Sequence, residues 1–88
     1  MRVDIYTKAS CGYCLQAKKL LQQKNIPYTE HTIGTQVTKE DIEAKIKGLG
    51  LNVSVRTVPQ IFYTDKSNTV HYIGGYSELL KSQHILGT

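Results

Sequence analysis

Two cysteines, Cys11 and Cys14, stand two residues apart at the point where an apolar, β-branched segment gives way to a helical pattern. They are the only cysteines in the 88-residue chain. Residues 2–7 alternate apolar with polar side chains as a strand does, and residues 12–24 place apolar side chains on one helical stripe. A Cys-x-x-C pair in this setting indicates dithiol redox chemistry, because the two thiols can close into a small disulfide and reopen.

The rest of the chain predicts further strands and helices. Residues 28–33 are rich in β-branched and aromatic side chains, which favours a strand. The spacing of Thr38 and Asp41 is that of a capping box, which predicts a helix after Thr38. The other expected elements are strands over 60–64 and 69–73, and a last helix over 77–85 with Leu79, Leu80, Ile85 and Leu86 as apolar anchors.

This order, β-α-β-α-β-β-α, predicts an α/β fold in a single domain spanning residues 1–88. The first strand, helix and strand form a parallel pair through a crossover, and the last two strands form a hairpin. Together they predict a four-stranded mixed sheet flanked by three helices, which lie on both faces. Ligands of such sheets bind at the carboxyl ends of strands, which is where the loop carrying Cys11 lies.

Composition excludes several classes of protein. Hydrophobic residues make up 40% and charged residues 20% of the chain, as in a soluble globular domain. A run of about 18 apolar residues is absent, so we expect no membrane partner. The first six residues lack the apolar stretch of a signal peptide, and we therefore expect a cytoplasmic protein.

The net charge of +4 favours anionic small molecules and acidic proteins as partners. It does not predict a nucleic-acid partner, because lysines alternate with acidic residues along 39–47 as on a solvated helix face.

The two thiols are expected to differ in role. Cys11 lies at or just before the first helical residue, where the free N–H groups of Tyr13 and Cys14 and the helix dipole stabilise a thiolate. Lys8 adds positive charge three residues upstream. Cys11 is therefore the predicted nucleophile, and Cys14, one turn inside the helix and more buried, is predicted to resolve a mixed disulfide.

The pair has two other interpretations, a structural zinc site and an inert pair of core cysteines. A structural zinc site needs about four ligands, and the chain has no second cysteine pair and only scattered histidines, at 31, 71 and 84. An inert pair of core cysteines is the other interpretation. Gly12 and Tyr13 between the thiols fit an exposed loop better than a core.

Three separated motifs resemble those of dithiol glutaredoxins. They are Ile5-Tyr6-Thr7-Lys8 leading into Cys11-Gly12-Tyr13-Cys14 and Ala17-Lys18, then Thr57-Val58-Pro59-Gln60-Ile61-Phe62, then Ile73-Gly74-Gly75-Tyr76. The resemblance covers essentially the whole chain and implies a thioredoxin-like fold. It also implies a glutathione-dependent thiol–disulfide oxidoreductase that acts on protein disulfides and glutathione mixed disulfides.

The resemblance also implies a glutathione site. Pro59 takes the position of the family's cis-proline, and the N–H and C=O of Val58 would pair with the backbone of glutathione. Lys8 would hold the glycine carboxylate, with a weaker case for Arg56. Tyr76 and Ser77 would hold the γ-glutamyl end. The residues expected to bind glutathione are Lys8, Tyr13, Thr57, Val58, Pro59, Gly75, Tyr76 and Ser77, with Gly74 permitting close backbone approach.

Two positions depart from the family pattern. Gly12 stands where many dithiol members carry proline, and Ser77 where the family often has aspartate. Small residues at the first position sometimes accompany a [2Fe–2S] cluster held between two subunits. The alternative function is therefore a cluster-binding dimer that uses Cys11 of each subunit and glutathione as ligands.

The resemblance implies several partners. The favoured enzyme is expected to be a monomer that uses glutathione as reductant. Its protein partners would be disulfide-containing or glutathionylated proteins, with ribonucleotide reductase as a candidate at the level of the family.

Overall fold

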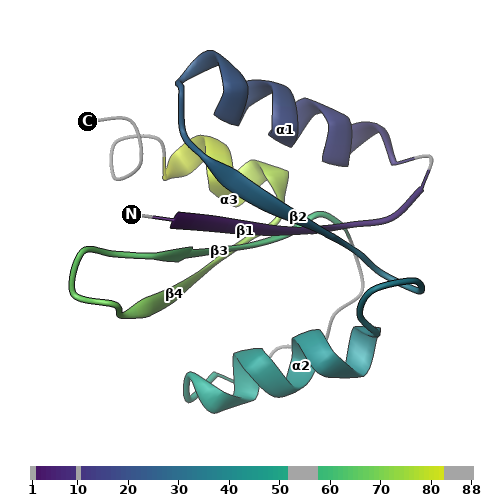
Figure 1. Ribbon diagram of the computed structural model, residues 1–88, viewed down its shortest axis with the longest axis vertical. Coiled ribbons are helices and arrows are strands. Elements are labelled where there is room, and N and C mark those ends of the chain that lie inside the picture. Colours follow the sequence, from purple (N-terminus) through teal and green to yellow (C-terminus); the bar gives the residue numbers. More distant parts are fainter. Residues whose placement is uncertain (1, 10, 52–57, 83–88) are drawn as a thin grey trace.

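The structure is a computed structural model of the chain that describes residues 2–9, 11–51 and 58–82. Its elements are β1 (Arg2–Thr7), α1 (Gly12–Gln23), β2 (Tyr28–Thr32), α2 (Lys39–Gly48), β3 (Gln60–Thr64), β4 (Val70–Gly74) and α3 (Tyr76–Lys81) (Figure 1). The predicted order β-α-β-α-β-β-α and the α/β class are confirmed. No helix within the described ranges is long and apolar enough to cross a membrane.

The four strands form one mixed sheet in the order β2-β1-β3-β4. β1 pairs with β2 in parallel and with β3 antiparallel, and β3 and β4 form an antiparallel hairpin. Thr7, the last residue of β1, lies opposite Thr32, the last residue of β2. The loop that leads to Cys11 therefore leaves the sheet at the carboxyl edge of its parallel pair.

Helices α1 and α3 cover one face of the sheet, and α2 covers the other (Figure 1). Alternation along β1 decides which side chains meet which helix. Val3 and Ile5 pack with Ala17, Leu21 and residues of β3 and α3 in one core cluster. On the other face, the buried cluster comprises Tyr6, Ile42, Ile46 and Phe62.

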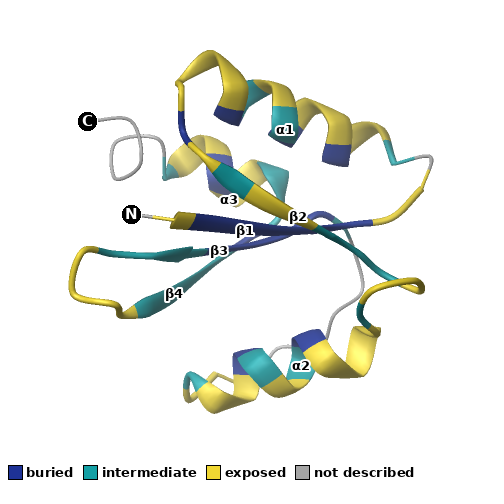
Figure 2. Cartoon of the chain, viewed as in Figure 1, coloured by how far each residue is buried: buried dark blue, intermediate teal, exposed yellow. Residues whose placement is uncertain are grey.

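The burial pattern explains why α1 holds its position. Its buried residues, Cys14, Ala17 and Leu21, lie on the single stripe that faces the sheet (Figure 2). Burying a side chain such as Leu21 contributes about 1.5–3 kcal/mol to stability. The packing that anchors the helix on the sheet therefore also keeps the Cys14 side chain buried.

The last helix differs in part from the prediction. α3 begins at Tyr76 rather than Ser77, and its start is set by Gly75. Leu79 is buried as expected, whereas the expectation for Leu80 was wrong, since it is 41% exposed. Leu80 follows Leu79 directly, and adjacent helical residues point about 100° apart, so one of them leaves the buried stripe. The expected anchors Ile85 and Leu86 lie outside the described residues.

Candidate active site

Cys11 is the N-cap of α1. Its sulfur accepts a hydrogen bond from the backbone N–H of Cys14, with an N···Sγ distance of 3.2 Å. The N-terminus of a helix stabilises negative charge, because its first N–H groups have no partner within the helix. The Cys11 thiol is also 3.7 Å from the backbone oxygen of Val58, to which it donates. One side chain thus bridges α1 and the segment before β3.

Cys14 is placed very differently. It is 2% exposed, whereas Cys11 is half-buried, and both thiols are free. Burial, followed by the hydrogen bond with Cys11, raises the pKa of the Cys14 thiol from 9.0 to about 12. The prediction that Cys14 is the more deeply buried of the two thiols is confirmed.

A groove of about 270 Å³ lies beside Cys11. The rings of Tyr13 and Tyr76 form part of it, with centroids 6.1 Å apart. The Val58–Pro59 peptide bond is cis, as the resemblance implied. Residues from three separate parts of the chain line this groove: Tyr13, Val58, Gly75, Tyr76, Ser77 and Glu78.

Two glycines let the backbone pass close to this groove. Gly74 has φ +114°, and a Cβ atom there would lie 3.0 Å from the Glu78 side chain. A Cβ atom on Gly75 would lie 3.3 Å from Oε1 of Glu78, a tight contact, and 3.5 Å from the carbonyl oxygen of Pro59, an ordinary one. Gly75 also donates its N–H to Oε1 of Glu78 at 2.8 Å, which fixes the entry into α3.

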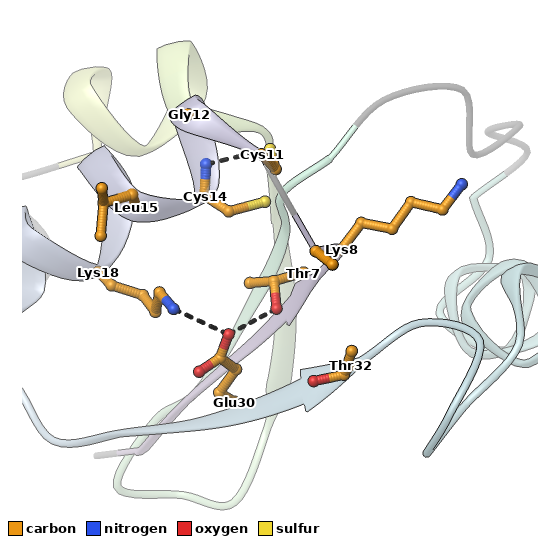
Figure 3. A pocket seen from close by; sticks show the side chains of 10 residues that line it. Thr7, Lys8, Cys11, Gly12, Cys14, Leu15, Lys18, Glu30 and Thr32 are labelled. Carbon is orange, nitrogen blue, oxygen red and sulfur yellow. Dashed lines mark hydrogen bonds and ion pairs between the residues drawn. The ribbon is translucent and has the colours of Figure 1, made fainter.

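A larger cavity, of about 590 Å³, also borders the thiols, is lined by residues of β1, β2 and α1 and of the loop before α1, and is open to solvent (Figure 3). Glu30 of β2 reaches across it to two donors. Its Oε2 accepts a hydrogen bond from the Thr7 hydroxyl at 2.6 Å and an ion-paired bond from the Lys18 ammonium at 3.0 Å. The side chain of Lys8, which also lines the cavity, extends away from this pair (Figure 3).

These contacts shift the ionisation of both partners. The Thr7 hydroxyl, followed by the Lys18 ammonium, lowers the pKa of Glu30. The hydrogen bond to Glu30 raises the pKa of Lys18. Both groups are therefore charged at neutral pH, and the pair is held beside the thiols.

The structure brings most of the predicted site residues together. Val58 contacts Cys11 and lines the groove together with Gly75, Ser77 and the two tyrosines, and the carbonyl oxygen of Pro59 lies beside Gly75. Lys8 borders the larger cavity instead of lining the groove. Thr57 and Arg56, which were also expected here, lie outside the described residues.

Sequence reasoning missed three charged residues. Lys18 belongs to the first of the three resembling motifs, but the resemblance gives it no role, although its position four residues after Cys14 predicts the same helix face. Glu30 had no sequence signal, because only the register of β2 brings it to Thr7 and Lys18. Glu78 carried no local signal either.

The described histidines lie outside both hollows. His31 pairs with Asp4 at 3.0 Å and His71 with Asp65 at 2.8 Å. Within residues 2–9, 11–51 and 58–82, no three acidic, histidine or cysteine side chains are grouped to hold a metal ion.

The fold and the Cys-x-x-C pair at the start of its first helix define a protein of the thioredoxin-fold class. A family model, Glutaredoxin, matches residues 3–67. The chain belongs to the glutaredoxin family.

Individual relatives agree with this assignment. Glutaredoxin 1 of Rickettsia typhi is 43% identical over 77 residues, which are 88% of this chain and 65% of that protein. The chain thus spans less than two thirds of that relative's length. The crystal structure of glutaredoxin 1 from Francisella tularensis superposes with a TM-score of 0.71 at 28% identity, covering 99% of this chain and 98% of that one. A buckwheat glutaredoxin–glutathione complex superposes with a TM-score of 0.65 at 26% identity, covering 94% and 68%.

Proposed function

We propose that the protein is a glutathione-dependent thiol–disulfide oxidoreductase that reduces protein disulfides and glutathione mixed disulfides. The observation that carries this proposal is the difference between its two thiols. Cys11 is half-buried at the helix N-terminus, and its sulfur already accepts an N–H donor. Cys14 is buried with its pKa raised to about 12, so its thiol stays protonated at neutral pH before the resolving step.

The first step is the attack of the Cys11 thiolate on a substrate disulfide. A bond forms between Cys11 Sγ and one substrate sulfur, the substrate S–S bond breaks, and the leaving thiolate takes a proton from solvent. The backbone N–H of Cys14, 3.2 Å from the attacking sulfur, stabilises the charge on Cys11 before the attack.

Two routes then release the mixed disulfide. In the dithiol route, Cys14 attacks Cys11 Sγ, an intramolecular disulfide forms, and the reduced substrate leaves as a thiol. In the monothiol route, a glutathione thiolate attacks the glutathione sulfur of the adduct, which forms glutathione disulfide and restores the Cys11 thiol. Glutathione also reduces the intramolecular disulfide of the first route in two successive exchanges.

Glutathione fits the groove beside Cys11. Val58 offers backbone donor and acceptor groups next to the thiol, so the cysteine backbone of the tripeptide can pair with it as a short added strand. The rings of Tyr13 and Tyr76 enclose the tripeptide, and the Ser77 hydroxyl and the Glu78 carboxylate suit the charged γ-glutamyl end. The buckwheat complex supports glutathione as the ligand, because that protein is a glutaredoxin with glutathione bound.

The test is the glutathione-coupled reduction of a small glutathione mixed disulfide, followed by NADPH oxidation through glutathione reductase. Turnover is expected in the native protein and is expected to vanish in Cys11→Ser. Cys14→Ser is the matched control: it should keep this monothiol activity and lose the reduction of protein disulfides. Full activity in Cys11→Ser, or no turnover in the native protein, would contradict the proposal.

The cluster-binding dimer stays a prediction from the resemblance. It uses Cys11 and glutathione as ligands, and both belong to the site described above. Purification with glutathione and iron tests it, because a brown dimer supports it and a colourless monomer excludes it. The monomeric state, the cytoplasmic location and ribonucleotide reductase as a partner likewise remain predictions for this chain.

A further inference from the structure

Lys18 and Cys14 lie on the same face of α1, four residues apart. Both line the cavity of about 590 Å³, and the Lys18 side chain turns into it toward Glu30 (Figure 3). The Lys18 side chain is only 25% exposed, so its ammonium is partly shielded from solvent. This cavity is separate from the groove proposed for glutathione, and the ion pair on its wall has no role in the steps described above.

Cys14 is the residue in this cavity whose ionisation is unfavourable. It is 2% exposed and must lose its proton before its sulfur can attack, because the thiolate is the nucleophile. Burial, followed by the hydrogen bond with Cys11, raises the pKa of the Cys14 thiol, whereas a backbone hydrogen bond with Lys8 and, to a smaller extent, the charge of Lys18 lower it. Three charged side chains line the cavity in the described residues. Lys8 extends away from the Lys18–Glu30 pair and Glu30 is negative, so Lys18 is the cation placed to stabilise a Cys14 thiolate.

The ammonium is held by a fixed acceptor. Glu30 Oε2 accepts from Lys18 and also from Thr7, a buried residue of the central strand. The carboxylate is thus fixed from the sheet, and the lysine is fixed by the carboxylate. A long side chain that would otherwise sample many rotamers is kept at the cavity wall that Cys14 shares.

We propose that Lys18 is a positioning residue for the resolving step, in which its ammonium, held by Glu30 and Thr7, stabilises the negative charge on Cys14 as that sulfur attacks Cys11. The proposal rests on the proposed function. In the step, the Cys14 proton passes to water in the open cavity, the Cys14–Cys11 S–S bond forms, and the bond from Cys11 to the substrate sulfur breaks. The substrate leaves as a thiolate and takes a proton from solvent.

The test uses 4,4′-dithiodipyridine, an uncharged disulfide, so that it depends neither on glutathione nor on charge steering. Cys11 attacks it and releases one thiopyridone in a phase whose rate scales with reagent concentration. Cys14 then displaces the second thiopyridone in a phase that is independent of concentration. Both are followed by absorbance in a stopped-flow instrument, with enough reagent to make the first phase the faster one.

Lys18→Met removes the charge and keeps the apolar stem. We expect the second phase to slow about tenfold, the effect of one pKa unit on the thiolate fraction. The first phase should change less than twofold. A second phase that keeps its native rate, or two phases that slow by the same factor, would overturn the proposal.

Two controls separate the charge from structural effects. Lys19→Met makes the same change in net charge at an exposed neighbour and should leave both phases unaltered. Glu30→Gln keeps an acceptor oxygen for both donors but removes the ion pair, so the second phase should run at least at the native rate. Equal slowing in Glu30→Gln and Lys18→Met would show that the ion pair acts only structurally, and would overturn the proposal. Urea unfolding of each variant verifies that it is folded.

Because no glutathione takes part, the outcome is independent of the coupled assay above. A protein without glutathione turnover but with a lysine-dependent second phase would refute the proposed glutathione dependence and keep this inference.

Discussion

The two hollows beside the thiol pair are built in opposite ways. The groove next to Cys11 is formed by two tyrosine rings and by backbone at Val58 and Gly75. The cavity that both thiols border is lined by polar and apolar residues, with the Lys18–Glu30 ion pair on its wall. The groove offers aromatic rings and backbone donors and acceptors beside the Glu78 carboxylate, and the cavity offers a cation that is paired with a carboxylate.

This difference corresponds to the two tasks of a dithiol. A substrate disulfide must be aligned over the half-buried thiol of Cys11, and backbone pairing and aromatic rings are suited to that alignment. The buried thiol needs no alignment, because α1 already holds it one turn from its target. It needs stabilisation of its charge against burial, for which a cation is suited. Variants of the two hollows should therefore affect different steps.

Gly74→Ala should have the largest effect. A side chain at φ +114°, with its Cβ 3.0 Å from Glu78, is expected to cost about 1–3 kcal/mol and to distort the entry into α3. Urea unfolding should show the loss of stability, and the KM for a glutathione mixed disulfide should rise. Gly34→Ala is the matched control, since it has φ +97° but open space around its Cβ position. The Gly34→Ala variant should lose stability without a change in KM. A KM that rises equally in Gly74→Ala and Gly34→Ala would contradict the role of the groove.

Tyr13→Ala tests the groove without disturbing the core. Tyr13 is 62% exposed, so its removal should leave stability within about 0.5 kcal/mol. The KM for a glutathione mixed disulfide should rise about five- to tenfold, with the concentration-independent thiopyridone phase unaltered. Leu15→Ala, 51% exposed on the same helix but outside the groove, should keep the native KM. An unchanged KM in Tyr13→Ala would remove the tyrosine from the site.

The buried thiol should make stability depend on alkaline pH. Cys14 titrates near 9.0 when unfolded and about 12 when folded, so the folded protein binds more protons between these values. Its contribution is fully present below pH 9 and is lost as pH rises above it, by up to about 1.4 kcal/mol per pH unit. Urea unfolding of the Cys11→Ser variant at pH 8, 9 and 10 should show the free energy of unfolding falling with this slope. The double variant Cys11→Ser with Cys14→Ala should show a smaller slope. Identical slopes would mean that Cys14 titrates normally.

Thr7→Val should have the smallest effect. It removes the hydroxyl that does most to lower the pKa of Glu30, so that pKa should rise toward 4.5. The lowered pKa stabilises the fold above pH 4.5, and this contribution is lost as pH falls. The free energy of unfolding at neutral pH should therefore be about 1 kcal/mol lower in the variant than in the native protein. An NMR titration of the Glu30 carboxylate is the direct measurement, with Thr32→Val as control in the same cavity. A Glu30 pKa that does not move would contradict the assigned cause.

The fold could be predicted from local patterns. The stripe of Cys14, Ala17 and Leu21 defines α1 and the capping box at Thr38 defines the start of α2, and both are present. The three motifs also predicted the groove and the cis bond at Pro59. The helix over 77–85 was predicted less well, because two adjacent leucines do not show which one faces the core.

The sequence by itself determined that this is an α/β protein with an unequal pair of thiols at the start of a helix. Spacing along one chain suffices for that, because helix and strand periodicities are local. Only the tertiary structure decided what surrounds Cys14. Glu30 reaches Thr7 and Lys18 because β2 lies parallel to β1 in one particular register, with Ile5 opposite Glu30. Pairing between strands 23 residues apart is set by the packing of the whole sheet, and no local pattern records it.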